Sequence, residues 1–426
     1  MILKIELANF FSIKEKVCID FRAANINTET ARALADNVID WNGTPVLKSI
    51  GLFGHNASGK SNIIKAIRFC CMLVLESHQH NEGTVFNFQP FKFDGYDKKP
   101  SSFLIDFVCN DIEYEYVFSL TRTEILSEQL YAYPNGRRAK VFTREGNTYT
   151  FGALMRRGND VAVNTSKKNL FLTRASSMNR DIAQTVYVYF LEKFLLGFVD
   201  FNNHTDIIQS LFESNKSLIL QAMEICDSDI QDIRLAKERI TAPFPVFNGE
   251  VISIKEFQQR EIERVRFKTT HRHSPEVEFD MEDEESDGTY QLFRILLRFL
   301  DVVRSEKSLL LDEFDGSLHT RLSDFVLDLI HASRKSQLLY TSHNTNLIDV
   351  KRLRKDQIVF VNKRQDGSTE VYSLYDYKDF RENMDAEKAY LQGRFDAVPI
   401  VSSSVSSLKK LLYETPVSPS NEKTLL

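Results

Sequence analysis

The chain has 426 residues, of which 42% are hydrophobic and 27% are charged, and its formal net charge is −5 at pH 7. This balance is typical of a globular protein with a sizeable core, and it excludes a disordered chain and a uniformly basic nucleic-acid binder. The five cysteines form no Cys-x-x-Cys pair, so we expect neither a zinc site nor a disulfide framework, and the expected compartment is the cytoplasm. The apolar stretches are too short or too charged to span a bilayer, so no membrane association is expected.

The first predicted elements form a strand, a glycine-rich loop and a helix. Residues 1–22 alternate apolar and polar side chains around a turn near Ser12, which predicts two adjacent strands. A short apolar run at 46–54 predicts another strand, which ends in glycine. From 61 to 76 the apolar side chains recur with the spacing of one helix face, which predicts a helix directly after the loop.

The remainder of the chain changes its pattern twice. Residues 86–151 alternate about turn residues and predict an antiparallel β region, whereas residues 166–240 have a helical period. From residue 290 onward, predicted helices and strands alternate, as in a mostly parallel sheet. The expected division is an N-terminal lobe at 1–165, a helical insertion at 166–270, a C-terminal lobe at 271–400 and a serine-rich tail at 401–426.

Residues 54–61 read Gly-His-Asn-Ala-Ser-Gly-Lys-Ser and fit the pattern G-x-x-x-x-G-K-[ST]. Glycines let the backbone N–H groups curl around phosphate oxygens, and the start of the following helix attracts the anion. Lys60 would neutralise the β- and γ-phosphates, and Ser61 would bind Mg²⁺. A glycine turn that only caps a helix is the alternative. The predicted nucleotide-binding residues are Gly54, Asn56, Ser58, Gly59, Lys60, Ser61 and Asn62.

A second half of the site is predicted where the apolar run 309–311 ends in Asp312 and Glu313. In a phosphate-loop protein the first acid at such a strand end holds Mg²⁺, and the following glutamate polarises the attacking water. An acidic pair after a strand is, on its own, more often a solvated loop. The presence of Lys60 favours the catalytic interpretation.

Three more groups are candidates for contact with phosphate. Ser286 and Gly288 lie at the start of a predicted helix, where backbone N–H groups offer a second anion site. His343 follows an apolar strand and could donate to a γ-phosphate, and Asp315 follows the acidic pair.

The order of the motifs GHNASGKS, SDGT, LLLDEFDGSLH and TSHN resembles the ATP-binding-cassette ATPase heads of SMC and RecF proteins. The segments PFKF at 90–93 and AEKAYLQGRFDAVPIV at 386–401 are more similar to the stand-alone AAA-type ATPases of bacterial abortive-infection and anti-phage operons, the RloA/AbiL-like group. The resemblance implies an α/β fold: an ABC-type P-loop ATPase head with a mostly parallel core sheet, an antiparallel β subdomain and an inserted helical subdomain.

The resemblance also implies roles for individual residues. Glu313, His343 and Lys60 would be catalytic, Ser286 and Gly288 would belong to the signature motif, and Asp315 to the D-loop. Gln89 is the candidate Q-loop residue and would join Ser61 and Asp312 at the metal. The signature here is Ser-Asp-Gly-Thr rather than the Ser-Gly-Gly-Gln of transporters.

In such families two heads meet head to tail around ATP and Mg²⁺, so the resemblance implies an ATP-hydrolysing homodimer or a higher oligomer. Its expected role is a nucleotide-driven sensor or regulator of a separate effector, a nuclease or toxin, in anti-phage defence. A DNA-repair clamp of the RecF type, which binds DNA in an ATP-dependent way, is the alternative, and an inactive ATP-binding protein is disfavoured by the acidic pair.

Nucleic acid stays open as a partner because basic residues cluster in three places, although solvated surface is the favoured interpretation. These clusters are Arg137, Arg138, Lys140 and Arg144; Lys167 and Lys168; and Lys351, Arg352, Arg354 and Lys355. The segment 276–287 opposes them with eight acids in twelve residues and runs into the signature motif.

Overall fold

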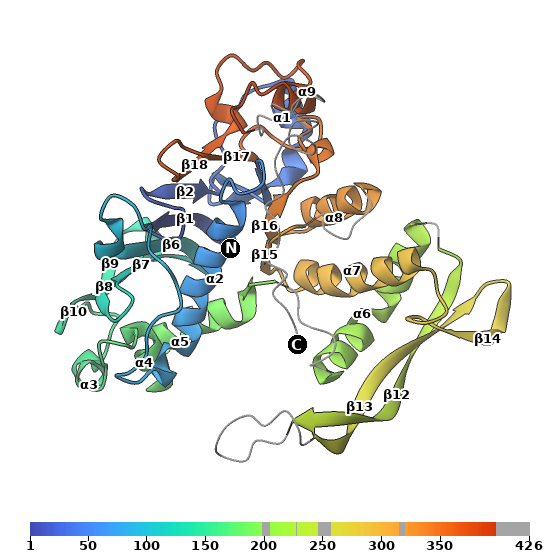
Figure 1. The fold of residues 1–426 in the computed structure, drawn as a ribbon, viewed down its shortest axis with the longest axis horizontal. Helices are drawn as coiled ribbons and strands as arrows, with labels where there is room; N and C mark the ends of the chain where they lie inside the picture. The colour runs from blue at the N-terminus through green and yellow to red at the C-terminus, as the bar shows by residue number, and fades with distance from the viewer. Residues whose placement is uncertain (198–204, 227, 246–256, 315–319, 398–426) are drawn as a thin grey trace, which may run out of the picture.

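The computed structural model describes residues 1–197, 205–226, 228–245, 257–314 and 320–397. At its centre is a six-stranded sheet in which the neighbouring strands are parallel, except that the edge strand β18 runs antiparallel to β17 (Figure 1). In sheet order the strands are β11 (Phe194–Leu195), β15 (Ser308–Leu311), β16 (Gln337–Ser342), β5 (Ser49–Phe53), β17 (Ile358–Lys363) and β18 (Thr369–Ser373). The predicted mostly parallel core sheet is therefore confirmed.

A second sheet of seven strands is antiparallel throughout and contains both the N-terminal strands and the β-rich region. In sheet order the strands are β10 (Thr148–Phe151), β9 (Ala139–Glu145), β8 (Ile125–Ala132), β7 (Ile112–Leu120), β6 (Ser101–Cys109), β1 (Ile2–Ala8) and β2 (Val17–Asp20). This sheet confirms the expected antiparallel β subdomain.

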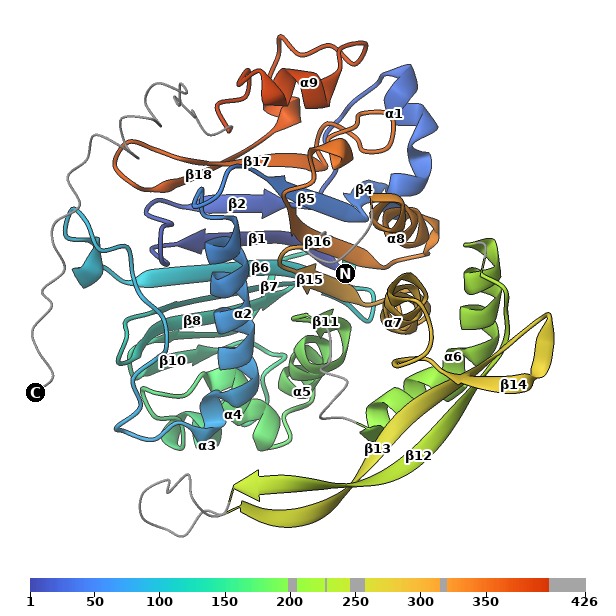
Figure 2. The ribbon, with the colours of Figure 1, turned by 45° about the vertical axis from the view of Figure 1, so that its right-hand side comes forward.

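The helix α2 (Lys60–Glu76) lies between the two sheets. Its buried face, which includes Ile63, Ile67 and Val74, shares one hydrophobic core with β1, β6 and β7 and with Leu310 and Leu339 of the core sheet (Figure 2). Three short helices close the far end of this core: α3 (Gly158–Val163), α4 (Phe171–Ser177) and α5 (Asp181–Val188).

The opposite face of the core sheet carries a second core. Side chains alternate along each strand, so Leu309 and Leu311 point to this face whereas Leu310 points to α2. The covering helices are α7 (Asp287–Arg304), α8 (Thr320–Ala332) and α9 (Ala386–Leu391). The core sheet is thus buried on both faces, which explains why its strands are continuous apolar runs.

Two smaller modules complete the fold. Near the start of the chain, α1 (Glu29–Ala33) precedes the hairpin of β3 (Val38–Trp41) and β4 (Thr44–Leu47). On the outer side of α7, the helix α6 (Thr205–Ile225) packs against a three-stranded sheet that extends away from the body of the molecule (Figures 1 and 2). Its strands are β12 (Ile230–Pro245), β13 (Phe257–His271) and β14 (Ser274–Asp280).

The second half of the predicted helical insertion is not helical. The prediction of helix as far as residue 240 is wrong from Ile230 onward, because β12 pairs with β13 in one long hairpin. Good helix formers such as Lys237 and Glu238 occur in this segment. Pairing with β13 and burial of Ile230 and Ile233 against α6 and α7 override that local preference.

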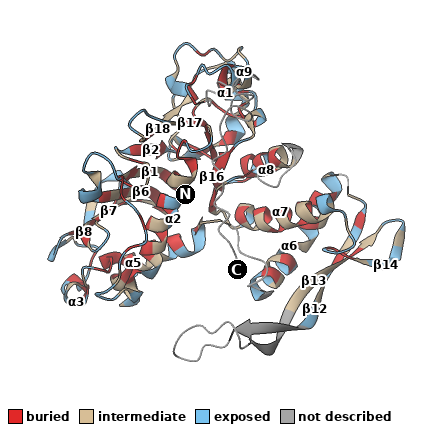
Figure 3. Ribbon diagram, viewed as in Figure 1, coloured by how far each residue is buried: buried red, intermediate tan, exposed pale blue. Residues whose placement is uncertain are grey.

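The acidic run at 276–287 is paired with the basic side chains of the hairpin. Asp280 forms ion pairs with Arg266 and with Lys268, each at 3.0 Å, and Glu282 forms an ion pair with Arg264 at 2.6 Å. These contacts neutralise part of the acidic charge of the run within its own module. In Figure 3 most described residues of this module are intermediate or exposed, whereas the strands of the core sheet are buried. Among the described residues, no helix is long and apolar enough to cross a membrane.

Candidate functional site

The loop from Gly54 to Ser61 joins β5 to α2, and two of its glycines are required by their surroundings. Gly54 has a φ of +158°, and a Cβ there would lie 2.2 Å from the carbonyl oxygen of Val361. Gly59 has a φ of +115°, and a Cβ there would lie 2.1 Å from Oγ1 of Thr369. Neither contact is possible for a real side chain, so β17 and β18 dictate glycine at both positions.

Two polar side chains of the loop are buried at its centre. Lys60 is 4% exposed, and its Nζ donates to the carbonyl oxygens of Gly54 at 2.6 Å and His55 at 3.2 Å. Ser58 is also buried, and its Oγ has no hydrogen-bond partner among the described residues. A buried cation and a buried hydroxyl donor beside curled backbone N–H groups fit the oxygens of a phosphate.

Asp312 follows β15 and faces the start of α2. Its Oδ1 accepts hydrogen bonds from Ser61 Oγ at 3.1 Å and from Thr341 Oγ1 at 2.7 Å. The Oγ1 of Thr341 in turn accepts from the backbone N–H of Glu313 at 2.8 Å. Thr341 on β16 therefore fixes both members of the acidic pair, and Glu313 is held with a φ of +53°.

These groups meet at one cavity of about 470 Å³. The cavity brings the phosphate loop together with Glu313 and His343, as the sequence predicted, and Asp312 is joined to its rim through Ser61. The full lining is Ser12, His55, Asn56, Ala57, Ser58, Gly59, Lys60, Ser61, Asn62, Glu313, His343 and Lys363.

The donor atoms beside this cavity suit Mg²⁺. Ser61 offers a hydroxyl oxygen and Asp312 a carboxylate, which are the ligand types that Mg²⁺ prefers, with water and phosphate oxygens completing its octahedron. Within the described ranges, no group of three or more His, Cys, Asp or Glu side chains could hold a metal by itself.

Three of the predicted residues, Gln89, Ser286 and Gly288, do not line this cavity. Gln89 is exposed, its carbonyl accepts from the N–H of Phe11 at 2.7 Å, and its side chain does not line the cavity, so its metal role stays a prediction. Ser286 caps α7, and its Oγ accepts from the N–H of Thr289 at 3.1 Å. Neither Ser286 nor Gly288 lines the cavity, and Asp315 lies outside the described residues.

Sequence reasoning missed a chain of hydroxyls behind the loop. Ser12 Oγ accepts from Asn62 Nδ2 at 2.7 Å and lies 2.7 Å from Thr369 Oγ1. The Thr369 hydroxyl donates to the carbonyl oxygen of Ser58 at 3.2 Å. The N-terminal loop and β18 thus support the phosphate loop from behind. The N-terminal Phe-Phe-Ser segment is a sequence signal that could have identified Ser12. Thr341 could have been identified by its position two residues before His343, whereas no local sequence pattern distinguishes Thr369.

Three residues of the basic clusters are not solvated surface. Arg144 is fully buried, lies 3.8 Å from Glu128, and donates to the carbonyl oxygen of Asn169 at 2.7 Å. Lys168 is 4% exposed, and Arg354 is 9% exposed and paired with Asp356 at 2.9 Å. The expectation of solvated surface is therefore wrong for these three, and they are equally unavailable to nucleic acid.

Three solved structures of SMC heads align with most of the chain at low sequence identity. An SMC head bound to the C-terminal winged-helix domain of ScpA is 17% identical, with 87% of this chain and 97% of that chain covered and a TM-score of 0.37. The SMC head domain from Thermotoga maritima is 14% identical, with 87% and 98% covered and a TM-score of 0.39. An SMC head with an extended coiled coil, bound to the C-terminal domain of ScpA from Pyrococcus furiosus, is 14% identical, with 93% and 99% covered and a TM-score of 0.33.

No curated protein matches the chain significantly. A family model described as "AAA domain, putative AbiEii toxin, Type IV TA system" matches residues 49–163 and 231–349, which together make up more than half of the chain. The matched ranges contain the phosphate loop, the acidic pair and His343. The chain therefore belongs to this AAA family and carries a P-loop ATPase domain.

Proposed function

We propose that the protein is a Mg²⁺-dependent ATPase that works as a nucleotide-driven regulator of a separate effector in anti-phage defence. The observation that carries the ATPase activity is the hydrogen-bonded set of Ser61, Asp312, Thr341 and Glu313 at the rim of the phosphate-loop cavity. In this proposal Ser61 and Asp312 would hold Mg²⁺, and Glu313 would orient the attacking water at the cavity that Lys60 also lines.

The residues around the cavity have separate tasks in this mechanism. Lys60 and the loop N–H groups bind the β- and γ-phosphates, while Ser61 and Asp312 hold Mg²⁺, which supplies charge stabilisation when bound. Glu313 orients the attacking water and accepts its proton, and His343 donates to the γ-phosphate. Rate enhancement then comes from positioning and from charge stabilisation.

The signature motif supports a composite site shared by two copies of the chain. Ser286 and Gly288 start α7 at an exposed position and do not line the cavity of their own chain. In a head-to-tail dimer this helix start would face the γ-phosphate held by the other copy's Lys60. ATP binding would close the dimer and hydrolysis would open it, which makes the nucleotide a conformational switch.

The regulatory role rests on the resemblance to abortive-infection ATPases and on the toxin-system description of the family. That description names no separate effector, so an effector that is a nuclease or another toxin is proposed from the resemblance alone. A RecF-type DNA clamp is less well supported, because burial removes Arg144, Lys168 and Arg354 from any basic track.

The direct test is phosphate release from Mg·ATP by the wild-type protein and by Lys60→Ala, with Lys65→Ala as the control. Both lysines lie on α2, but Lys65 is exposed and does not line the cavity. We expect Lys60→Ala to lose at least 100-fold in turnover and Lys65→Ala to keep wild-type turnover. Equal turnover of the two variants would refute the proposed site.

A further inference from the structure

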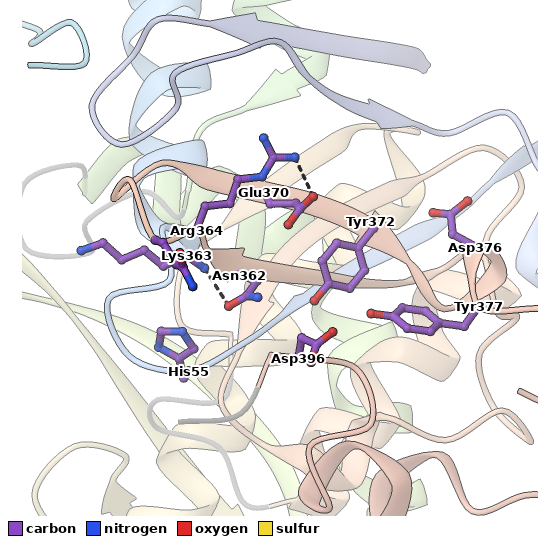
Figure 4. Close-up of a pocket in the computed structure, with 10 residues that line it drawn as sticks. His55, Asn362, Lys363, Arg364, Glu370, Tyr372, Asp376, Tyr377 and Asp396 are labelled. Carbon is purple, nitrogen blue, oxygen red and sulfur yellow. Dashed lines mark hydrogen bonds and ion pairs between the residues drawn. The ribbon is translucent and has the colours of Figure 1, made fainter. Parts of the chain in front are cut away.

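Two further cavities lie beside the phosphate loop and the helix that follows it. The larger, of about 1020 Å³, includes Tyr372 and Tyr377 in its lining and shares His55 and Lys363 with the phosphate-loop cavity, so it adjoins the site already described (Figure 4). The other, of about 570 Å³, has no lining residue in common with either cavity and is called the α2 groove below. Its lining is Phe11, Lys65, Arg68, Phe69, Met72, Leu73, Glu76, His80, Thr84, Val85, Phe86 and Asn87.

The α2 groove runs along one face of α2, the helix that lies beside the antiparallel sheet in Figure 2. Lys65, Arg68, Phe69, Met72 and Glu76 follow one another at spacings of three and four residues, which places them on the same side of the helix. At a rise of 1.5 Å per residue, the groove extends over about 16 Å, or about three helical turns.

The floor of the groove is apolar and well supported. Phe11 and Phe69 are partly buried against the main core, and the Phe69 ring centroid lies 6.1 Å from that of Phe10 and 4.8 Å from that of Phe88. At the rim, Val85 is 54% exposed. A concave apolar surface of this kind is typical of a site that receives apolar side chains of a ligand.

The wall opposite α2 is held in place by the rest of the protein. The buried Lys168 donates from Nζ to the carbonyl oxygen of Thr84 at 2.5 Å. The backbone N–H of Phe86 donates to the carbonyl oxygen of Arg122 at 2.8 Å. The groove is therefore formed before any ligand binds, which lowers the cost of binding.

The two ends of the groove carry opposite charges. Lys65 and Arg68 are exposed at the end nearer the phosphate loop, and Glu76 is exposed at the other end. Within the part of the chain that the structure describes, none of these three side chains has an ion-pair partner. The charges favour a ligand with carboxylates beside an apolar stripe, whereas the apolar floor and Glu76 disfavour a nucleic-acid backbone.

The groove also touches the segment that supports the phosphate loop. Phe11 has a φ of +52°, which is strained for a bulky side chain, and its N–H donates to the carbonyl oxygen of Gln89 at 2.7 Å. The next residue, Ser12, accepts from Asn62 Nδ2 and lies 2.7 Å from Thr369 Oγ1. A ligand seated on Phe11 therefore lies one residue away from the contacts that support the nucleotide site.

We propose that the α2 groove binds an amphipathic helix of a separate protein. The helix places apolar side chains at positions i, i+3 or i+4, and i+7 between Phe69 and Val85, and carboxylates opposite Lys65 and Arg68. Identifying this partner with the regulated effector rests on the proposed function. The chemistry of the docked helix does not, because it follows from the lining of the groove alone.

The probe is a phage-displayed library of random peptides of about 16 residues, enough for about four helical turns. It is selected on the immobilised full chain, and enriched peptides are synthesised and titrated by fluorescence anisotropy. We expect them to combine the apolar pattern with Asp or Glu. Enrichment of peptides without acidic residues, or of none with the apolar pattern, would overturn the proposal.

Two variants with matched controls locate the binding site. Arg68→Glu is expected to weaken an enriched peptide at least fivefold, and a peptide with its acidic residue changed to Lys should recover affinity for this variant. Val85→Ser is expected to weaken binding at least threefold. The controls are Arg381→Glu and Val163→Ser, both exposed and outside the groove, and they should bind as wild type does. Unchanged affinity in both Arg68→Glu and Val85→Ser would refute the groove.

A photo-reactive p-benzoylphenylalanine at position 85 distinguishes the possible occupants. Irradiation with an enriched peptide is expected to cross-link that peptide. Cross-links to residues 398–426 or to a second copy of the chain instead would assign the groove to those occupants and overturn the proposal. Phosphate release is measured on the same preparations. Peptide binding without phosphate release would remove the proposed ATPase alone, whereas phosphate release without peptide binding would remove the docking helix alone.

Discussion

The hydroxyl of Ser61 donates a hydrogen bond to Oδ1 of Asp312 over 3.1 Å, although the two residues are 251 positions apart. The contact joins the start of α2 to the end of β15 on the same edge of the core sheet. Parallel strands bring their carboxyl ends to one edge, which is why motifs so distant in the chain meet there. The site therefore depends on the register of β5, β16 and β15 as much as on the motifs.

Thr341→Val is expected to lower kcat at least tenfold with little change in KM. Its hydroxyl donates to Asp312 and accepts from the Glu313 N–H, so valine keeps the shape of the side chain and removes both hydrogen bonds. Thr341 is a positioning residue, and Thr341→Ser, which restores the hydroxyl, is expected to recover most of the activity. A valine variant with wild-type kcat would show that this hydroxyl does not position the acids.

Glu313→Gln is expected to retain ATP binding and to lose turnover by about 100-fold or more, the scale of general-base catalysis. If two heads close around ATP, the variant should accumulate as an ATP-bound dimer, with twice the monomer mass by light scattering. Glu192→Gln is the control, since Glu192 is exposed and distant in the chain from the acidic pair. A monomeric Glu313→Gln protein at saturating ATP would contradict the dimer.

Gly59→Ala is expected to abolish detectable ATP binding. The new Cβ would approach Thr369 Oγ1 to 2.1 Å, and the φ of +115° is strained for alanine, which costs about 1–3 kcal/mol. Gly83→Ala is the control, because the atom nearest to an added Cβ there, Oδ1 of Asn81, would be 3.5 Å away. Thermal denaturation and ATP titration of both variants measure the difference, and equal ATP affinity would show that the loop tolerates the shift.

The free energy of unfolding is expected to fall as the pH drops from about 6.5 toward 4, because of His331. Its Nε2 lies 2.8 Å from Ser49 Oγ and 3.4 Å from the donating amide of Gln357. Burial and then the charge of Lys48 lower the pKa of His331 from 6.5 to about 4. Between these values the unfolded chain binds the extra proton, so stability is complete above pH 6.5 and is lost on acidification.

The size of this effect is about 3 kcal/mol, from about 2.5 pKa units at 1.36 kcal/mol each. Urea denaturation at several pH values measures it. His331→Gln should flatten the dependence between pH 4.5 and 6.5, whereas His273→Gln, at an exposed position, should not. An unchanged slope in His331→Gln would assign the acid sensitivity to other groups.

Local sequence patterns were sufficient to predict the elements whose structure depends mainly on neighbouring residues. The glycine loop, the amphipathic face of α2 and the apolar strand before Asp312 are each set by neighbours within a few residues, and the structure has them as predicted. The β12 strand shows the opposite case, since Lys237 and Glu238 favour a helix locally and only pairing with β13 makes the segment extended.

The sequence by itself determined the P-loop motif, the acidic pair, the class of fold and the expectation that the chain binds phosphate. Each of these depends on the order of residues within short segments. Only the tertiary structure decided that Thr341 fixes both acids, that Ser12 and Thr369 support the loop, that Arg144 is a buried partner of Glu128, and that a tyrosine-lined cavity adjoins His55. These contacts join segments that are up to 357 residues apart. Their energies depend on packing and strand register, which no local pattern encodes.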